Sequence, residues 1–166
     1  MTSYERTRSH VRERKDRQIE ETVHDPYRER YKPEGSAFCP QCNAVFHDGR
    51  WQWSEKRDNA FAHPCPACRR IKDAYPAGYV TLSGEFAAEH AKEIMGLVNN
   101  EEAQAKAEHP LERIMETRAE DGKTIITTTG IHVARRIGEA LHHAWKGRLD
   151  IKYLPDECLV RILWER

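Results

Sequence analysis

Two pairs of cysteines have the spacing of a metal site. Cys39 and Cys42 form one Cys-x-x-Cys pair, and Cys65 and Cys68 form the other. A tight turn of this length presents two thiolates to one side, and two such turns complete the tetrahedral sulfur set that Zn²⁺ prefers. The 22 residues from Asn43 to Pro64 separate the pairs, slightly more than the roughly 15–20 residues of the common pattern. The sequence therefore predicts one structural zinc ion per chain, held by these four cysteines.

Other chemistries of four thiolates stay open at this point. Iron binds the same ligand set, and the sequence does not separate it from zinc. A thioredoxin-type redox pair needs its Cys-x-x-Cys at the start of a helix, whereas both pairs here lie among prolines. His47 or His63 could replace one cysteine, although we expect both histidines to lie outside the ligand set. Four protein ligands leave no open position for water, so we expect no metal catalysis.

The remaining reactive side chains do not form a known catalytic motif. The sequence contains no nucleotide-binding loop, nucleophile elbow or HExxH motif. We expect Cys158 to be a small buried residue of a strand, and His142 and His143 to lie on a helix surface. Residues 127–130 precede a predicted helix, where an N-cap is a simpler role than a phosphate site. We predict that the protein is not an enzyme; an active site assembled only by the fold is the remaining alternative.

Length and charge bound the kind of protein that carries these cysteines. The chain has 166 residues, with 27 Lys and Arg against 27 Asp and Glu, which is the size of one domain or two small ones. Neutrality excludes a globally basic nucleic-acid binder but leaves room for a local basic surface. Five cysteines without an apolar leader favour thiolates in a reducing compartment, so we expect a cytoplasmic protein. No apolar stretch approaches the roughly 18 residues of a membrane helix.

The sequence pattern divides the chain into three segments. Residues 1–32 carry a net charge of +2 and few apolar side chains, which predicts a flexible arm that orders on a partner or a merely solvated tail. Residues 33–75 carry a net charge of +1, and their prolines favour turns around a metal-stapled hairpin, a zinc ribbon. Residues 76–166 carry a net charge of −3 and show hydrophobic periodicity.

The third segment predicts an α+β fold. Its expected elements are a strand at 79–82, a helix at 85–106, a hairpin turning at Asp121-Gly122, a helix at 131–145 and strands at 149–153 and 160–164. This order is that of a split βαβ, or ferredoxin-like, unit, in which two helices cover one face of an antiparallel sheet. We therefore predict a zinc ribbon followed by a ferredoxin-like domain.

Cations and aromatic side chains alternate on the predicted ribbon. A stapled hairpin holds its side chains in place before binding, which lowers the ordering cost of recognition. Cations can contact phosphates while an aromatic face stacks on an unpaired base. The alternative is that the tryptophans form the ribbon's own core and the charges are only solvated. The residues predicted to contact nucleic acid are Arg50, Trp51, Trp53, Lys56, Arg57, Arg69, Arg70 and Lys72.

The predicted sheet lacks the features of an RNA-recognition motif. That module displays aromatic side chains on its central strands, whereas the two strands around Asp121-Gly122 have none. The net charge of −3 agrees with this. We expect residues 76–166 to form a scaffold or a surface that docks a protein.

Several stretches resemble one known family. These are the knuckles CPQC and CPAC, the basic run RRIKD, the stretch YPAGYVTLSGEF and the later segment TTTGIHVARRIGEAL. They are similar to the N-terminal part of the archaeal and eukaryotic nonsense-mediated-decay-three-like proteins, which are adaptors of the large ribosomal subunit built from zinc-binding C-x-x-C modules. The similarity covers residues 37–153. That family has more C-x-x-C pairs and further domains, so this chain resembles a compact relative of the kind found in bacteria.

The resemblance implies a function linked to RNA or the ribosome, with Cys39, Cys42, Cys65 and Cys68 as metal ligands. Our first hypothesis is therefore a non-enzymatic zinc-ribbon protein that binds RNA or a ribosomal subunit. The second is an adaptor or regulator that binds a protein through residues 76–166, with the ribbon as a structural staple.

Overall fold

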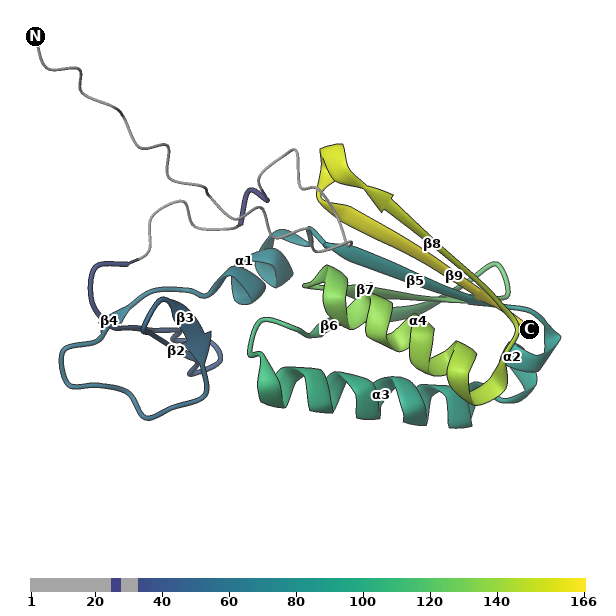
Figure 1. Ribbon diagram of the computed structural model, residues 1–166, viewed down its shortest axis with the longest axis horizontal. Helices are drawn as coiled ribbons and strands as arrows, with labels where there is room; N and C mark the ends of the chain where they lie inside the picture. Colours follow the sequence, from purple (N-terminus) through teal and green to yellow (C-terminus); the bar gives the residue numbers. More distant parts are fainter. Residues whose placement is uncertain (1–24, 28–32) are drawn as a thin grey trace, which may run out of the picture.

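The computed structural model describes residues 25–27 and 33–166, so most of the predicted arm at 1–32 lies outside the described residues. A small unit (residues 33–75) and a large unit (residues 76–166) lie end to end (Figure 1). Each unit contains one β-sheet, and the described residues form four α-helices. The predicted α+β class is confirmed.

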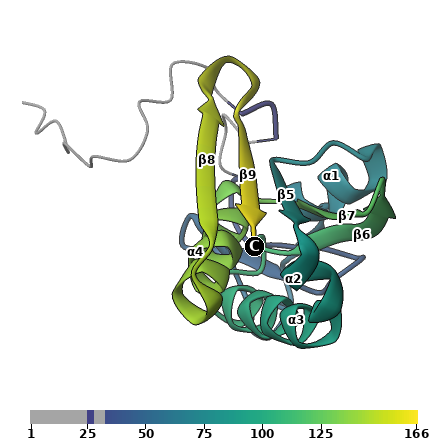
Figure 2. The same cartoon turned by 90° about the vertical axis from the view of Figure 1, so that its right-hand side faces the viewer.

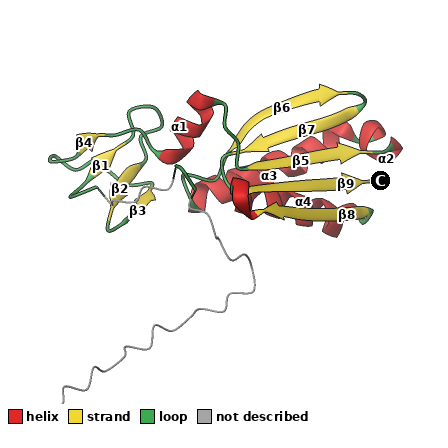
Figure 3. Cartoon of the chain, turned by 90° about the horizontal axis from the view of Figure 1, so that it is seen from above, coloured by secondary structure: helices red, strands yellow, loops and turns green. Residues whose placement is uncertain are grey.

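The small unit consists of short strands joined by turns. Its sheet has the order β3-β2-β1-β4, in which β1 and β4 pair in parallel. Prolines and turn residues limit the length of every strand. Helix α1 (Pro66–Asp73) follows the sheet and leads toward the large unit (Figure 3). The strands are β1 (Ala37–Phe38), β2 (Val45–His47), β3 (Arg50–Gln52) and β4 (Phe61–Ala62).

In the large unit, two long helices pack on one face of a five-stranded sheet (Figures 1 and 3). The strand order is β6-β7-β5-β9-β8. The short helix α2 lies beside the C-terminus at the end of this sheet that points away from the small unit (Figure 2). The elements are β5 (Gly78–Ser83), α2 (Glu85–Glu89), α3 (Ala91–Glu108), β6 (Ile114–Glu120), β7 (Lys123–Thr128), α4 (Ile131–Trp145), β8 (Arg148–Leu154), the 3₁₀ turn η1 (Pro155–Glu157) and β9 (Leu159–Glu165).

The prediction of a purely antiparallel sheet is wrong at one pairing. Strands β5 and β9 pair in parallel, with Val80 opposite Ile162, and β8 occupies the edge. The burial of the two strands explains this order. Val160, Ile162 and Trp164 of β9 are almost completely buried, whereas no residue of β8 is buried to that extent. The more apolar strand therefore takes the interior position between β5 and β8, where both of its neighbours protect it from water.

Two local predictions about the large unit also need correction. The expected helix at 85–106 is two helices, because the chain bends at His90, whose ring stacks on that of Phe86 with centroids 4.0 Å apart. Cys158 does not lie within a strand: it follows η1, has a positive φ of 49° and is half-buried. His142 and His143 are exposed on α4, as predicted. The Asp121-Gly122 hairpin is confirmed, and both of its turn residues have positive φ.

The core of the large unit lies between the sheet and the two long helices. Buried side chains from the central strands pack against Ile94 of α3 and Ile137 of α4. Helix α4 approaches the sheet closely at Gly138, where a Cβ atom would lie 2.7 Å from Ile162 Cγ2. This core is independent of the cysteines. In the described part of the chain, no helix has both the length and the apolar character needed to cross a membrane.

Replacing Ile162 by alanine is expected to lower the free energy of unfolding by about 2–5 kcal/mol, because it leaves a cavity at an interior strand. Leu163 is the matched control, since it lies next in the same strand but is only half-buried. Leu163→Ala should cost clearly less. Urea denaturation followed by circular dichroism measures both variants, and equal losses would contradict the assignment of the core face.

Candidate metal centre

The first cysteine pair lies in a tight turn between β1 and β2. The Cys39 backbone N–H donates to Ala44 O at 2.8 Å, and the Asn43 N–H donates to Cys39 O at 2.8 Å. Asn43 has a positive φ of 63°, a conformation that asparagine tolerates better than most residues. The turn places Cys39 in the interior and Cys42 near its edge.

The second pair lies at the start of a helix rather than in an isolated turn. Cys65 is the N-cap residue of α1, and its Sγ accepts a hydrogen bond from the Cys68 N–H at 3.4 Å. Pro66 occupies the first helical position, where its missing N–H costs nothing. The first turn of α1 therefore presents both sulfurs to the same side.

The four sulfur atoms gather into one cluster. The Sγ atoms of Cys39, Cys42, Cys65 and Cys68 all lie within 4.8 Å of one another, and those of Cys42 and Cys65 are 3.7 Å apart. A tetrahedral ion with zinc–sulfur bonds would hold its sulfurs about 3.8 Å apart. All four cysteines are free thiols. The geometry fits one structural metal site, as the spacing predicted.

Full ionisation of the four cysteines requires a nearby cation. Burial and the neighbouring sulfurs raise the pKa of Cys65, and burial also raises that of Cys68. Burial opposes ionisation of Cys39 too, but backbone N–H groups, including that of Cys65 at 3.3 Å, outweigh it and lower the pKa of Cys39 to about 7. Four thiolates this close repel one another, so the fully ionised set needs a positive charge among them.

One cation of the large unit already contacts the cluster, and sequence reasoning missed it. Arg113 Nη2 donates to Cys65 Sγ at 3.2 Å and to Cys42 and Cys68 Sγ at 3.6 Å each, while Nη1 donates to Cys68 Sγ at 3.5 Å. Burial opposes the charge on Arg113, but its sulfur contacts outweigh burial and raise its pKa. Arg113 is far from both cysteine pairs in the sequence, so no spacing pattern marks it.

The two histidines near the cysteines are not part of the cluster. His47 Nε2 contacts Arg57, and the same ring lies 3.1 Å from an Asp48 carboxylate oxygen. His63 stacks on Trp51, with ring centroids 6.5 Å apart. Among the described residues, the four cysteines are the one group placed to hold a metal ion.

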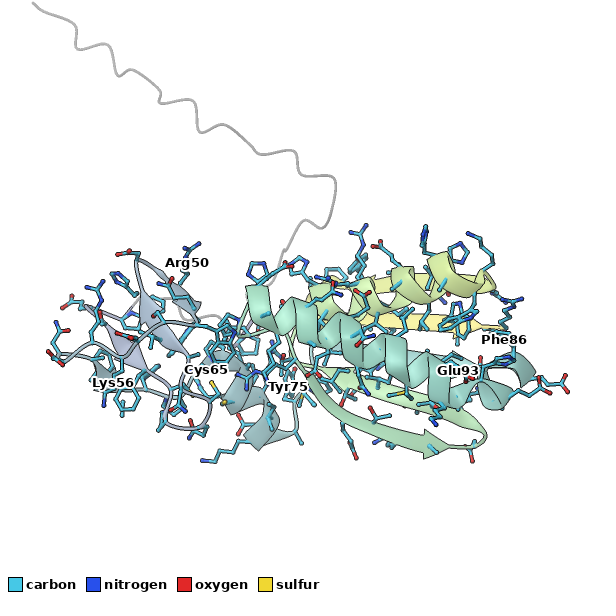
Figure 4. The ribbon with its side chains drawn as sticks, turned by 90° about the horizontal axis from the view of Figure 1, so that it is seen from below. Arg50, Lys56, Cys65, Tyr75, Phe86 and Glu93 are labelled. Atoms are coloured by element: carbon cyan, nitrogen blue, oxygen red, sulfur yellow. The ribbon has the colours of Figure 1, made fainter. Side chains whose placement is uncertain are left out.

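The residues predicted to contact nucleic acid occupy different environments. Figure 4 shows Arg50 and Lys56 on the small unit, apart from each other, with Cys65 toward the large unit. Lys56 Nζ lies over the Phe38 ring, 3.8 Å from its centroid. The exposed members of the set are Arg50, Trp53, Lys56, Arg57 and Lys72, and the half-buried members are Trp51 and Arg69.

The prediction that Arg70 contacts nucleic acid needs correction, because its side chain is not available to a phosphate. It is only 2% exposed, and its guanidinium forms an ion pair with Asp25 and donates to Tyr75 O at 3.1 Å. The Tyr27 ring lies 4.4 Å from the guanidinium carbon, and the Tyr27 hydroxyl donates to Asp73 at 2.8 Å. Arg70 therefore fixes the described residues of the predicted arm to α1.

The two tryptophans have separate roles. Trp51 belongs to the interior of the small unit, where it meets Phe46 edge-on with centroids 5.6 Å apart. Trp53 is 40% exposed, and its indole N–H donates to Lys106 O at the end of α3, at 2.6 Å. The alternative in which the tryptophans form the core of the small unit therefore holds for Trp51. Trp53 instead connects the two units.

Exposed apolar side chains concentrate on the small unit. Within the described ranges, the large hydrophobic residues with high exposure are Trp53, Phe61, Ile71 and Tyr75, at 40–47%. All four lie between residues 53 and 75. Exposed apolar groups next to cations are typical of surfaces that bind a partner.

Comparison with protein-family models, curated proteins and solved structures found no match. The resemblance to nonsense-mediated-decay-three-like proteins therefore stays a prediction.

Replacing Cys65 by serine is expected to abolish metal binding, because it removes the most buried part of the second knuckle. The control is Cys158→Ser, whose sulfur lies outside the cluster. Elemental analysis of the purified proteins should give one metal ion per chain for the wild type and for Cys158→Ser, and far less for Cys65→Ser. A folded wild type without metal would contradict the assignment.

Proposed function

We propose that this chain is a non-enzymatic, zinc-dependent RNA-binding protein that binds single-stranded RNA through its small unit. Zinc suits four thiolates in a closed tetrahedral set with no position left for water. In this proposal the metal replaces the apolar core that so short a sheet lacks. The resemblance to adaptors of the large ribosomal subunit makes ribosomal RNA the first RNA to test.

The observation that carries the proposal is a hollow of about 550 Å³ beside the second knuckle. Helix α1 contributes Arg69 and Lys72 to its rim, together with the exposed Ile71. His63 forms another part of the wall, and Phe61 packs edge-on against His63 with centroids 6.1 Å apart. Two cations and the His63 ring therefore line this hollow together with Asp73, and the exposed Phe61 ring lies next to it.

This arrangement matches the two demands of single-stranded RNA. The cations on α1 can contact phosphates, and their attraction is sequence-independent and sensitive to salt. The exposed ring of Phe61 offers a face to an unpaired base. Cys68 also lines the hollow, so a metal held by the four cysteines would fix the first turn of α1 and order these side chains before RNA arrives.

Reversing both charges, Arg69→Glu with Lys72→Glu, is expected to weaken binding of a labelled single-stranded RNA. The slope of log affinity against log salt should become less steep by about 1.4, because two phosphate contacts to a single strand are lost. Fluorescence anisotropy over a range of salt concentrations measures both effects.

The matched control for this charge reversal is Lys123→Glu with Arg148→Glu. Both residues are exposed cations of the large unit, and the net charge changes by the same amount. The proposal is wrong if both double variants lose the same affinity.

The second candidate function is docking of a protein on the large unit, and one observation favours it. The face of the large sheet opposite α3 and α4 is uncovered by any described element (Figure 3). This face displays Tyr79 at its centre, with the Arg161 guanidinium 5.0 Å from the ring centroid. The two strands around Asp121-Gly122, β6 and β7, carry no aromatic residue, as the sequence indicated, and Tyr79 lies on the neighbouring strand β5.

Affinity capture with and without nuclease distinguishes the two candidates. If RNA is the direct partner, the captured material should be RNA and nuclease should remove any proteins that accompany it. Proteins that remain after nuclease, and that are lost on replacing Tyr79 by alanine, would favour docking on the large sheet instead.

A further inference from the structure

Arg113 reaches from the large unit into the sulfur cluster of the small unit. Its guanidinium makes four contacts of 3.2–3.6 Å with the sulfurs of Cys42, Cys65 and Cys68. The residue is only 7% exposed. Figure 4 shows Cys65 at the junction of the two units, which is where this side chain arrives.

The large unit holds Arg113 in this position by contacts that do not involve the cysteines. Its Nε donates to Pro110 O at 2.8 Å, and its backbone N–H donates to Thr129 Oγ1 at 2.9 Å. The Thr129 N–H returns a hydrogen bond to Arg113 O at 2.9 Å. Next to it, Glu112 accepts a hydrogen bond from the Val133 N–H at the start of α4. The guanidinium is therefore aimed at the cluster by the fold of the large unit.

The charge of the loaded site gives this contact its importance. A divalent ion with four thiolates carries a net charge of −2, and burial of such a charge without compensation is costly. A guanidinium brings the total to −1, and its N–H groups hydrogen-bond the ligand sulfurs. Groups that hydrogen-bond metal ligands in this way orient them and tune their affinity.

We propose that Arg113 is an integral part of the metal centre: it compensates the charge of the metal–thiolate cluster and thereby fastens the small unit to the large unit. Metal loading then determines how firmly the two units are joined. This inference depends on the metal site alone and does not depend on whether the small unit binds RNA.

A competition experiment tests the first half of the proposal. Full-length zinc-loaded protein is titrated with a chromogenic zinc chelator, for the wild type, Arg113→Gln, Arg113→Lys and Arg118→Gln. Arg118 is the matched control. It lies in β6, the strand that follows Arg113, but it is exposed and pairs with Glu120. Arg113→Gln should bind zinc about 10–100-fold more weakly, and Arg118→Gln should match the wild type.

The lysine variant keeps the test decisive if Arg113→Gln does not fold. Lysine retains the charge but lacks the fork of donors that reaches several sulfurs at once. Its zinc affinity should fall between those of the wild type and the glutamine variant. Wild-type affinity in a folded Arg113→Gln overturns the charge compensation, and wild-type affinity in Arg113→Lys overturns the role of the guanidinium fork.

A measurement of whether the two units tumble together tests the second half of the proposal, that Arg113 fastens the small unit to the large unit. Amide ¹⁵N relaxation gives separate rotational correlation times for residues 37–75 and 78–165 of the zinc-loaded protein. These times should agree in the wild type and differ in the folded Arg113 variants. Trp53→Phe removes the hydrogen bond from Trp53 to Lys106 O, which also joins the units, and should leave zinc affinity unchanged. Equal correlation times in every Arg113 variant overturn the fastening role.

Discussion

The close packing of four cysteine sulfurs is the constraint on which the small unit depends, because their full ionisation needs a cation among them. Their sulfurs lie within 4.8 Å of one another, and the buried cluster around them contains only Cys39, Cys65 and two alanines. Strands of two or three residues cannot bury enough apolar area to hold such a cluster together. A bound cation would favour the ionised form of all four cysteines and would link the turn at Cys39–Cys42 to the start of α1.

The large unit is stabilised by an apolar core instead of a metal site. Its core of aliphatic side chains and Trp164 contains no cysteine, and hydrogen bonds to Pro110 and Thr129 hold Arg113 against the cluster. The small unit contributes the four cysteines, and the large unit contributes Arg113, which donates to three of their sulfurs. The sulfur cluster therefore lies where the two units meet.

Features governed by local chemistry could be predicted from the sequence. The cysteine pairs are recognisable because chelation by a short turn requires their spacing, and Asp121-Gly122 is recognisable because both residues adopt positive φ. Features governed by distant contacts could not. The interior position of β9 follows from competition between two strands for burial, and Arg70 is buried because Asp25, far away in the sequence, pairs with it. Arg113 has no periodic or spacing signal, since its position depends on Thr129.

The central claim is that the four cysteines bind one zinc ion. Zinc K-edge X-ray absorption spectroscopy of the purified protein tests it most directly, because it reports the identity, number and distance of the ligands. We predict four sulfur neighbours at about 2.3 Å and no oxygen or nitrogen neighbour. A shell containing oxygen or nitrogen, or folded protein without zinc, would contradict it.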